Sequence, residues 1–559
     1  MQEYGTVTTF IEVLNASGVE YVFFNPGIDN VPLLETISRY HATDKKAPRS
    51  ILCLDEFVTM TAAHGNYMAT GRPQAVSVHS ELGTLQIGGA LHNAQWGKVP
   101  VVFFTESLGP AQRTDWQGNA FDQGRMVRNL VKWDHQVTEG EDIGEAFSEA
   151  FRIATTEPCG PVYLTLPRDV LWRRGNASSG ASPVTAPITP PPKKAAPEDL
   201  DAAAAMLLAA ENPLIITGHS GRNRKSVTSL TVLAESLGAR VQSADTRMNF
   251  PNTHPLAACD HPNPESGIPL LSTADAILAI DYDMHYAAPP VFPKSDARII
   301  HIDIDIAKNG VPLWERQPDI SIEGDSSSLI PALTDAVQKL LTSEKRRSIL
   351  GRCAKIKAEH VAIRKEWKSL AESHSAKKPV SAHWLCRCIN EVVTDDTIIV
   401  NQTVSPSMIV ANMVRRNRPG TLVSCAGGCI GWAPGAALGV KLASPDSTVV
   451  SLMGDGAFIY GCPESTLWSA GFYHAPFLSI IFNNRGYGAV KELFHERYDV
   501  ENMGADIPAS PNYAMIAQSC NAYGQTVKEP ADLLPALDEA LAQLKKGRPA
   551  VLDVRIEPV

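Results

Sequence analysis

The chain has 559 residues, of which 44% are hydrophobic and 20% are charged, as in ordinary globular proteins. At this length one hydrophobic core is not sufficient, and about three or four domains are expected. The net charge of -10, with no cluster of Lys and Arg, argues against nucleic acid or an anionic membrane surface as a partner.

The sequence has no feature of an exported or membrane-bound protein. No apolar run reaches the ~18 residues that a membrane-spanning helix requires, and no basic segment followed by an apolar core opens the chain. Its 10 cysteines are scattered, and the close pairs Cys386/Cys388 and Cys425/Cys429 have no zinc-site partners nearby. We therefore expect reduced thiols and a cytoplasmic location.

The first 172 residues alternate strand-like and helix-like segments. A Met- and Ala-rich helix is expected over residues 57–71, with Gly71 at its C-terminal end. Short apolar runs bounded by turn residues predict strands near 18–27, 49–56, 74–80, 99–106 and 160–167. This alternation predicts a parallel, doubly wound α/β sheet.

The rest of the chain repeats this organisation. Residues 173–197 are rich in Pro, Ser, Ala and Gly and are expected to form a linker. A second α/β unit is expected at 198–342, a charged helical linker at 343–378 and a third α/β unit at 379–559. The predicted fold is therefore three doubly wound parallel-sheet α/β domains.

Two motifs in the third unit follow predicted buried strands. Gly454-Asp455-Gly456 comes after the apolar run 447–453, and Asn483-Asn484 comes after a second apolar run at 477–482. Because parallel strands end at one edge of a sheet, Asp455 and Asn484 are expected side by side. Carboxylate and amide oxygens suit Mg²⁺, and the glycines allow a diphosphate to approach the backbone. The alternative is a glycine turn and an unrelated Asn-rich turn.

This spacing of GDG and NN resembles the signature of thiamin diphosphate (ThDP) enzymes. The whole chain resembles the acetolactate synthase and benzoylformate decarboxylase superfamily of thiamine pyrophosphate-requiring proteins. The resemblance is carried by FFNPGIDNVPLLE, LCLDEFVTMTAAHGNYMATGRPQAVSVHS, LVKWD, GPVYLTLPRDV and ARIIHIDID. It implies an N-terminal pyrimidine-binding domain, a middle domain and a C-terminal diphosphate-binding domain, in that order.

The resemblance implies that Glu56 is a catalytic residue. In the family, a Glu at the end of this strand bonds the pyrimidine N1′ and promotes deprotonation of the thiazolium C2. Alone, Glu56 would be read as an acid that stabilises a helix N-terminus. Asn25, Pro26 and Gly27 match the loop over the pyrimidine. The next residue is Ile28, where benzoylformate decarboxylase has a serine that meets the substrate carboxylate, so benzoylformate itself is a poor candidate substrate.

Three further residues are substrate-site candidates: His79 and His285 by resemblance, and Glu81 because it could share the pocket with His79. His79 matches an active-site histidine of benzoylformate decarboxylase and has the chemistry to relay a proton. The alternative is a strand-end histidine bonded to local backbone. Glu81, expected in the loop after this strand, and His285 in the middle domain are weaker candidates, because a solvated acid and a surface histidine are common.

The remaining cofactor contacts are also implied by the resemblance. Thr403 and Ser405 match hydroxyls that touch the diphosphate, with N-capping as the alternative for them. Ile430 matches the bulky residue that holds the cofactor bent. Ala457 extends the GDG motif, and Gly486 matches the backbone ligand that joins Asp455 and Asn484 on the metal. The glycine-rich loop and arginine that bind FAD in acetolactate synthase are missing, so FAD is not expected.

The resemblance implies a Mg²⁺- and ThDP-dependent enzyme that decarboxylates a 2-oxo acid through an enamine intermediate and releases an aldehyde. An acetolactate synthase-like carboligase that forms a 2-hydroxy ketone is the main alternative. Hydrolysis of a cyclic dione and a non-catalytic ThDP-fold subunit are remote ones. Relatives bind the pyrimidine and the diphosphate on different subunits, so a homodimer or homotetramer with active sites between subunits is expected.

Overall fold

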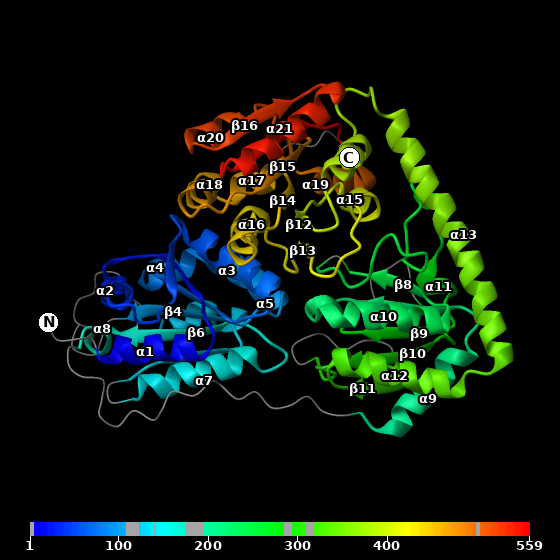
Figure 1. Cartoon of the computed structure of the whole chain (residues 1–559), viewed down its shortest axis with the longest axis horizontal. Coiled ribbons are helices and arrows are strands. Elements are labelled where there is room, and N and C mark those ends of the chain that lie inside the picture. The colour runs from blue at the N-terminus through cyan, green and yellow to red at the C-terminus, as the bar shows by residue number, and fades with distance from the viewer. Residues whose placement is uncertain are drawn as a thin grey trace.

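The computed structural model contains three parallel α/β sheets, which confirms the predicted fold class (Figure 1). It describes residues 5–107, 122–138, 141–173, 195–244, 246–283, 293–308, 317–498 and 504–558. Most of the predicted linker at 173–197 lies outside these residues, and the domain bounds stay predictions. No helix in the described ranges is long and apolar enough to cross a membrane.

The N-terminal sheet has six parallel strands in the order β2-β1-β3-β4-β6-β5. Its strands are β1 (Tyr21–Asn25), β2 (Arg49–Leu52), β3 (Gln74–Val78), β4 (Val101–Ser107), β5 (Trp133–Gln136) and β6 (Val162–Pro167). Its helices are α1 (Gly5–Ala16), α2 (Val31–Ala42), α3 (Glu56–Thr70), α4 (Ser80–Gln86), α5 (Gly88–Trp96), α6 (Gly124–Val127), α7 (Ile143–Thr155) and α8 (Arg168–Leu171), with 3-10 turns η1 (Ile28–Asn30) and η3 (Arg128–Leu130).

The middle sheet has five parallel strands in the order β11-β10-β9-β7-β8. Its strands are β7 (Pro213–Thr217), β8 (Arg240–Ser243), β9 (Ala276–Ile280), β10 (Arg298–Asp303) and β11 (Ile320–Glu323), and its helices are α9 (Pro197–Ala209), α10 (Arg224–Leu237), α11 (Leu270–Thr273) and α12 (Ser326–Leu340). The helix α13 (Ser343–Ser373) then runs along one side of the molecule from the middle sheet to the C-terminal sheet (Figure 1).

The C-terminal sheet has six parallel strands in the order β13-β12-β14-β15-β17-β16, which repeats the N-terminal order. Its strands are β12 (Ile398–Gln402), β13 (Leu422–Ser424), β14 (Val449–Gly454), β15 (Leu478–Asn483), β16 (Tyr523–Val527) and β17 (Ala550–Arg555). Its helices are α14 (Ala382–Val392), α15 (Ser407–Met413), α16 (Trp432–Ala443), α17 (Asp455–Tyr460), α18 (Pro463–Phe472), α19 (Gly488–Arg497), α20 (Tyr513–Ser519) and α21 (Leu533–Lys545).

Helix α3 has clear signals at both ends. The Asp55 carboxylate accepts hydrogen bonds from the backbone N–H groups of Phe57 and Val58, at 2.7 and 3.4 Å. Gly71 ends the helix in the left-handed conformation, with φ of 70°, as the sequence predicts. Asp55 is therefore the N-cap, and Glu56 becomes the first helical residue.

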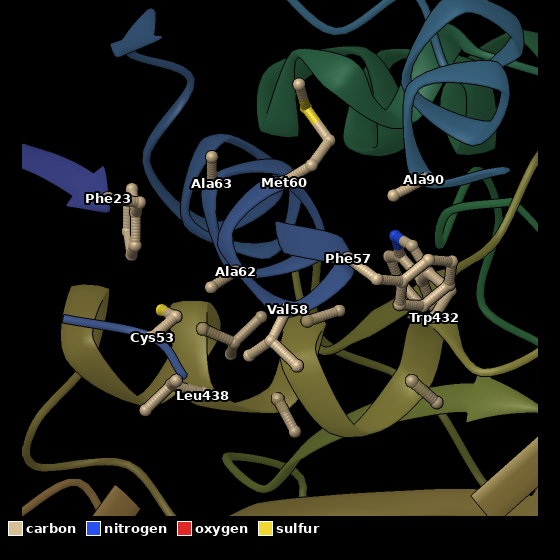
Figure 2. Close-up of a cluster of buried hydrophobic side chains, with 14 of the residues drawn as sticks. Phe23, Cys53, Phe57, Val58, Met60, Ala62, Ala63, Ala90, Trp432 and Leu438 are labelled. Carbon is tan, nitrogen blue, oxygen red and sulfur yellow. The ribbon is translucent and has the colours of Figure 1, made fainter. Parts of the chain in front are cut away.

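Helices α3 and α16 cross at very short range between the N-terminal and C-terminal domains. A Cβ atom on Gly439 would lie 1.9 Å from the Ala62 carbonyl oxygen, and one on Gly65 would lie 2.1 Å from the Ala436 carbonyl oxygen. Figure 2 shows apolar side chains of α3 facing α16 at this crossing. The cluster includes Phe57, Val58, Ala62, Trp432 and Leu438, all buried. Small residues at the crossing thus allow one apolar core to span two domains.

We expect Gly439→Ala to destabilise the protein, because the added methyl group must displace the backbone of α3. Overpacking of this kind costs about 1–3 kcal/mol. Gly351→Ala is the matched control: Gly351 lies in α13, with nothing within 4 Å of its Cβ position. There, improved helix propensity should stabilise by about 0.5–1 kcal/mol. Denaturant unfolding of both variants measures the two changes, and two changes of the same sign would contradict the tight crossing.

Candidate active site

The N-terminal candidates lie at the carboxyl edge of their sheet. Strand β1 pairs with β2 on one side and β3 on the other, and Asn25 is opposite Val78. The chain leaves this sheet in opposite directions after β1 and β3, which makes this edge a topological switch point, where α/β folds bind ligands. The segment Asn25-Pro26-Gly27 follows β1, and His79 follows β3.

The Glu56 carboxylate is half-buried and has no hydrogen-bond or ion-pair partner among the residues that the structure describes. Gly83 of α4 lies beside it: a Cβ atom there would be in ordinary contact with the Glu56 Cγ atom, at 3.4 Å, and would clash with the Val78 side chain, at 2.7 Å. As the first residue of α3, Glu56 has its backbone set by the helix, while its carboxylate oxygens remain available within the described ranges. A carboxyl group in this state suits a ligand that offers a basic ring nitrogen.

His79 is paired with Asp29, a residue that the sequence analysis did not single out. The His79 Nδ1 atom lies 2.7 Å from one Asp29 oxygen, and the Ser80 backbone N–H donates to the other at 3.1 Å. The Asp29 side chain is 1% exposed and the His79 side chain is 43% exposed. The pair therefore combines a buried Asp29 carboxylate with a His79 imidazole that is partly exposed at the carboxyl edge of the sheet.

The loop after β1 is pinned to the sheet. Asn30 accepts a hydrogen bond from the Gly27 N–H at 2.9 Å and donates to the Ser77 hydroxyl at 2.6 Å. Ile28 is 75% exposed beside this loop and offers only apolar contact. Glu81 is half-buried in the first turn of α4 rather than in the loop that the sequence suggested. His285 lies outside the described residues.

The C-terminal candidates occupy the equivalent switch point, between β12 and β14. Thr403 and Ser405 follow β12, Asp455 follows β14 and Asn484 follows β15. The Thr403 hydroxyl donates to Asn401 at 2.9 Å, whereas the side chains of Ser405 and Asn484 have no hydrogen-bond partner within the described ranges. A Cβ atom on Gly488 would lie 2.3 Å from the Ser405 hydroxyl and 2.7 Å from the Asn484 amide nitrogen. These two free polar groups are therefore neighbours.

Asp455 is almost fully buried, 1% exposed, at the start of α17. Its oxygens accept from the N–H groups of Gly456 and Gly486, at 3.0 and 3.1 Å. Burial nevertheless raises the pKa of this carboxyl above its ordinary value. A buried carboxylate next to a free amide and the Gly486 backbone fits a divalent cation, which would offset the cost of burying the charge.

Ile430 lies in a short loop that is hydrogen-bonded to side chains of both outer domains. The amide of Asn93, on α5, donates to the Cys429 carbonyl at 2.8 Å and accepts from the Cys429 N–H at 3.1 Å. Gln402, at the end of β12, also donates to this carbonyl, at 3.0 Å, and accepts from the Ala433 N–H at 3.1 Å. Neither amide was identified from the sequence. Asn93 is fully buried, so the loop has little freedom.

A different group of ligand-type side chains lies far along the chain from these sites. His374, His383 and Glu557 come within 4.8 Å of one another, the one such group of three or more His, Cys, Asp or Glu side chains in the described residues. Ser381 bonds both imidazoles, and Lys377 pairs with Glu557. These partners account for the cluster as a polar junction between α13, α14 and the C-terminal segment.

Comparison with known families identifies the three domains. Residues 6–126 match the family model described as "Thiamine pyrophosphate enzyme, N-terminal TPP binding domain", residues 200–333 match the central domain and residues 403–554 match the C-terminal TPP binding domain. The chain belongs to the thiamine pyrophosphate enzymes. The superfamily inferred from the sequence is thus confirmed, and both cofactor-binding domains of a thiamine pyrophosphate enzyme are present.

Curated relatives of this thiamine pyrophosphate enzyme cover almost all of it. Benzoylformate decarboxylase of Pseudomonas aeruginosa is 27% identical, over 98% of each chain. A probable acetolactate synthase large subunit of Methanocaldococcus jannaschii is 26% identical, over 98% of this chain and 91% of its own. Benzoylformate decarboxylase and acetolactate synthase, the two activities that the sequence resembles, are therefore both represented among its relatives.

Solved structures support the same fold. The thiamine diphosphate-dependent 4-hydroxybenzoylformate decarboxylase of Rhodococcus jostii RHA1 superposes with a TM-score of 0.80, at 23% identity over 99% of both chains. Benzoylformate decarboxylase from Polynucleobacter necessarius gives a TM-score of 0.79 at 21% identity. At these identities the likeness concerns the three-domain architecture alone.

We expect Asn93→Ala to weaken ThDP binding by about tenfold, because the partly buried Cys429 N–H loses its partner and the Ile430 loop loosens. An unsatisfied buried donor costs about 1–3 kcal/mol. Isothermal titration with ThDP and Mg²⁺ measures the affinity. Gln95→Ala is the control, since Gln95 lies on the same helix and makes an exposed hydrogen bond to Asn129. Equal affinities of the two variants would contradict a positioning role for Asn93.

Proposed function

We propose that this chain is a Mg²⁺- and ThDP-dependent enzyme that decarboxylates a 2-oxo acid. The observation that carries the proposal is the half-buried carboxylate of Glu56 at the N-terminal switch point, which has no partner in the described part of the chain. The resemblance to the family implies that the cofactor pyrimidine would bind at this acid. A non-catalytic member would have no need of it, so this alternative is not favoured.

The proposed metal site consists of Asp455, Asn484 and the Gly486 backbone carbonyl. Support comes from the raised pKa of the buried Asp455 and from the Asn484 amide, which has no hydrogen-bond partner among the residues that the structure describes. Mg²⁺ there would link the protein to a diphosphate, and Ser405 offers a neighbouring hydroxyl. Gly454, Gly456, Ala457 and Thr403 would line the rest of the diphosphate site.

Bound ThDP supplies a carbon nucleophile and an electron sink, which make loss of CO₂ from a 2-oxo acid possible. The protein then has three tasks. Glu56 would hold a proton at the pyrimidine ring nitrogen. Ile430 would support the cofactor from its clamped loop. His79 would deliver or remove a proton at the reacting carbon.

The product branch is a separate question, because both outcomes share these residues. Proton capture after decarboxylation gives an aldehyde, whereas capture by a second carbonyl compound gives a 2-hydroxy ketone. We favour the aldehyde because His79 presents a partly exposed imidazole at the same edge as Glu56. Incubation with pyruvate and larger 2-oxo acids, scoring CO₂, aldehyde and 2-hydroxy ketone, decides between the two. The exposed Ile28 favours substrates with an apolar side chain.

The middle domain is proposed to work without FAD. Its switch point lies between β7 and β9, where nucleotides bind in open sheets. There the Arg222 guanidinium is ion-paired with Asp281 at 2.6 Å, and Ser326 also bonds this carboxylate. The crevice thus holds a buried network of side chains.

The enzyme is proposed to act as a homodimer or homotetramer with its active sites between subunits. Large apolar side chains are exposed beside both switch points: Ile28, Leu54, Leu82 and Leu85 in the N-terminal domain, and Val404, Ile459 and Tyr487 in the C-terminal domain. Exposed apolar side chains gathered at two functional edges are typical of surfaces that a partner covers. A second copy of the chain would cover both edges.

Glu56→Gln should reduce turnover by roughly 10²–10⁴-fold while ThDP affinity changes little, because the amide keeps the shape but cannot hold the proton. Steady-state kinetics and titration with ThDP measure the two effects. Asp55→Asn is the matched control: asparagine caps helices as well as aspartate does, so the adjacent carboxylate should be dispensable. Full turnover of Glu56→Gln would remove the proposed mechanism.

The double substitution Leu82→Lys and Leu85→Lys should dissociate the oligomer, because four charges per dimer would be buried without partners. Sedimentation velocity should detect a folded monomer, and decarboxylase activity should fall with dissociation. Leu350→Lys is the control, since Leu350 is equally exposed on α13, away from both switch points. An active monomer of the double variant would disprove the shared active site.

A further inference from the structure

We infer that Asp29 is the positioning residue that sets which nitrogen of His79 takes part in proton transfer. The inference rests on the proposed function, since it assigns a role behind the histidine of that site. Three observations carry it: the geometry of the pair, the burial of the carboxylate and the close approach of Gly27.

The geometry fixes the tautomer of the imidazole. One Asp29 oxygen accepts a hydrogen bond from the Ser80 backbone N–H, and the other lies 2.7 Å from His79 Nδ1. Because an ionised carboxylate can only accept, this contact requires a hydrogen on Nδ1. Nε2, on the opposite side of the ring, then carries the lone pair. This nitrogen accepts a proton to give an imidazolium, which keeps its Nδ1–H bond to Asp29, and later returns the proton through the same atom.

The surroundings make this pair rigid. A Cβ atom on Gly27 would lie 2.1 Å from His79 Nδ1 and 2.4 Å from the Asp29 oxygen, although the backbone of Gly27 is in an ordinary extended conformation. Glycine is therefore required by the two side chains and not by the turn. Asn30 holds the same 3-10 turn to Ser77 of β3. The carboxylate and the ring thus approach each other from two elements joined by a hydrogen bond.

Other charged groups surround the pair. Asp29 shares a small cavity of about 20 Å³ with Glu106 of β4, enough for one water molecule. Glu106 pairs with Arg168 of α8 at one oxygen, its other oxygen has no partner in the described part of the chain, and burial raises its pKa. Glu56 begins α3, and Glu81 lies in the first turn of α4, two residues after His79. None of these groups replaces Asp29 as the hydrogen-bond partner of Nδ1.

The decisive test is a double-substitution cycle with Asp29→Asn and His79→Ala. If Asp29 acts through His79, Asp29→Asn should lower kcat about 10²-fold in the native background. In the His79→Ala background it should cause less than a threefold further loss. A full second 10²-fold loss would overturn the inference, because Asp29 would then act independently. Asp122→Asn is the control for charge removal, since Asp122 forms a surface ion pair with Arg128 in the same domain.

A measurement without turnover separates this inference from the proposed function. In ¹⁵N-histidine-labelled protein, the His79 resonances, assigned by their loss in His79→Ala, should report Nδ1–H in the native chain and a change of tautomer in Asp29→Asn. Asp29→Glu should restore part of both the native tautomer and kcat. An unchanged tautomer in Asp29→Asn would overturn the inference even in an active enzyme. An Nδ1–H tautomer in a chain without ThDP-dependent activity would refute the proposed function alone.

Discussion

The contact on which this structure depends is the crossing of α3 and α16. Gly65, Gly435 and Gly439 bring the two helices so close that a single methyl group would meet a backbone oxygen or a threonine hydroxyl. The Asn66 amide adds a hydrogen bond to the Gly439 carbonyl across the crossing. This close packing joins the apolar faces of two domains into one core. Because α3 also begins with Glu56, the helix that joins the domains is the helix that presents the proposed catalytic acid.

The two outer domains use the same sheet order, and both place functional groups at the same kind of edge. In each sheet the chain turns in opposite directions from two neighbouring strands and leaves a crevice at their carboxyl ends. The N-terminal crevice presents Glu56 and His79, which we propose to handle protons. The C-terminal crevice presents Asp455 and Asn484, which suit a cation and a diphosphate. One topology thus supports two different chemistries through the residues that follow its strands.

The architecture could be predicted from the sequence because buried parallel strands leave continuous apolar runs, and motifs such as GDG follow them directly. Residues whose role depends on contacts between distant segments could not. Asp29 meets His79 across 50 positions of the chain, and Asn93 meets Cys429 across 336. Asn93 stands outside the matched motifs. Asp29 lies inside the matched segment FFNPGIDNVPLLE but reads locally as an ordinary polar residue. The sequence predicts a loop at Glu81 because α4 is short and begins directly after the end of β3.

The two hydrogen bonds between Asn93 and the Cys429 backbone have a thermodynamic consequence. One side chain of the N-terminal domain holds the backbone of the loop that would support the cofactor from the C-terminal domain. Cofactor binding at that loop and docking of the two domains therefore depend on the same contacts. Such linkage is reciprocal. If domain docking increases the affinity for the ligand, the bound ligand stabilises the docked state by the same free energy. The supply of ThDP would then affect the stability of the folded enzyme as well as its catalytic activity.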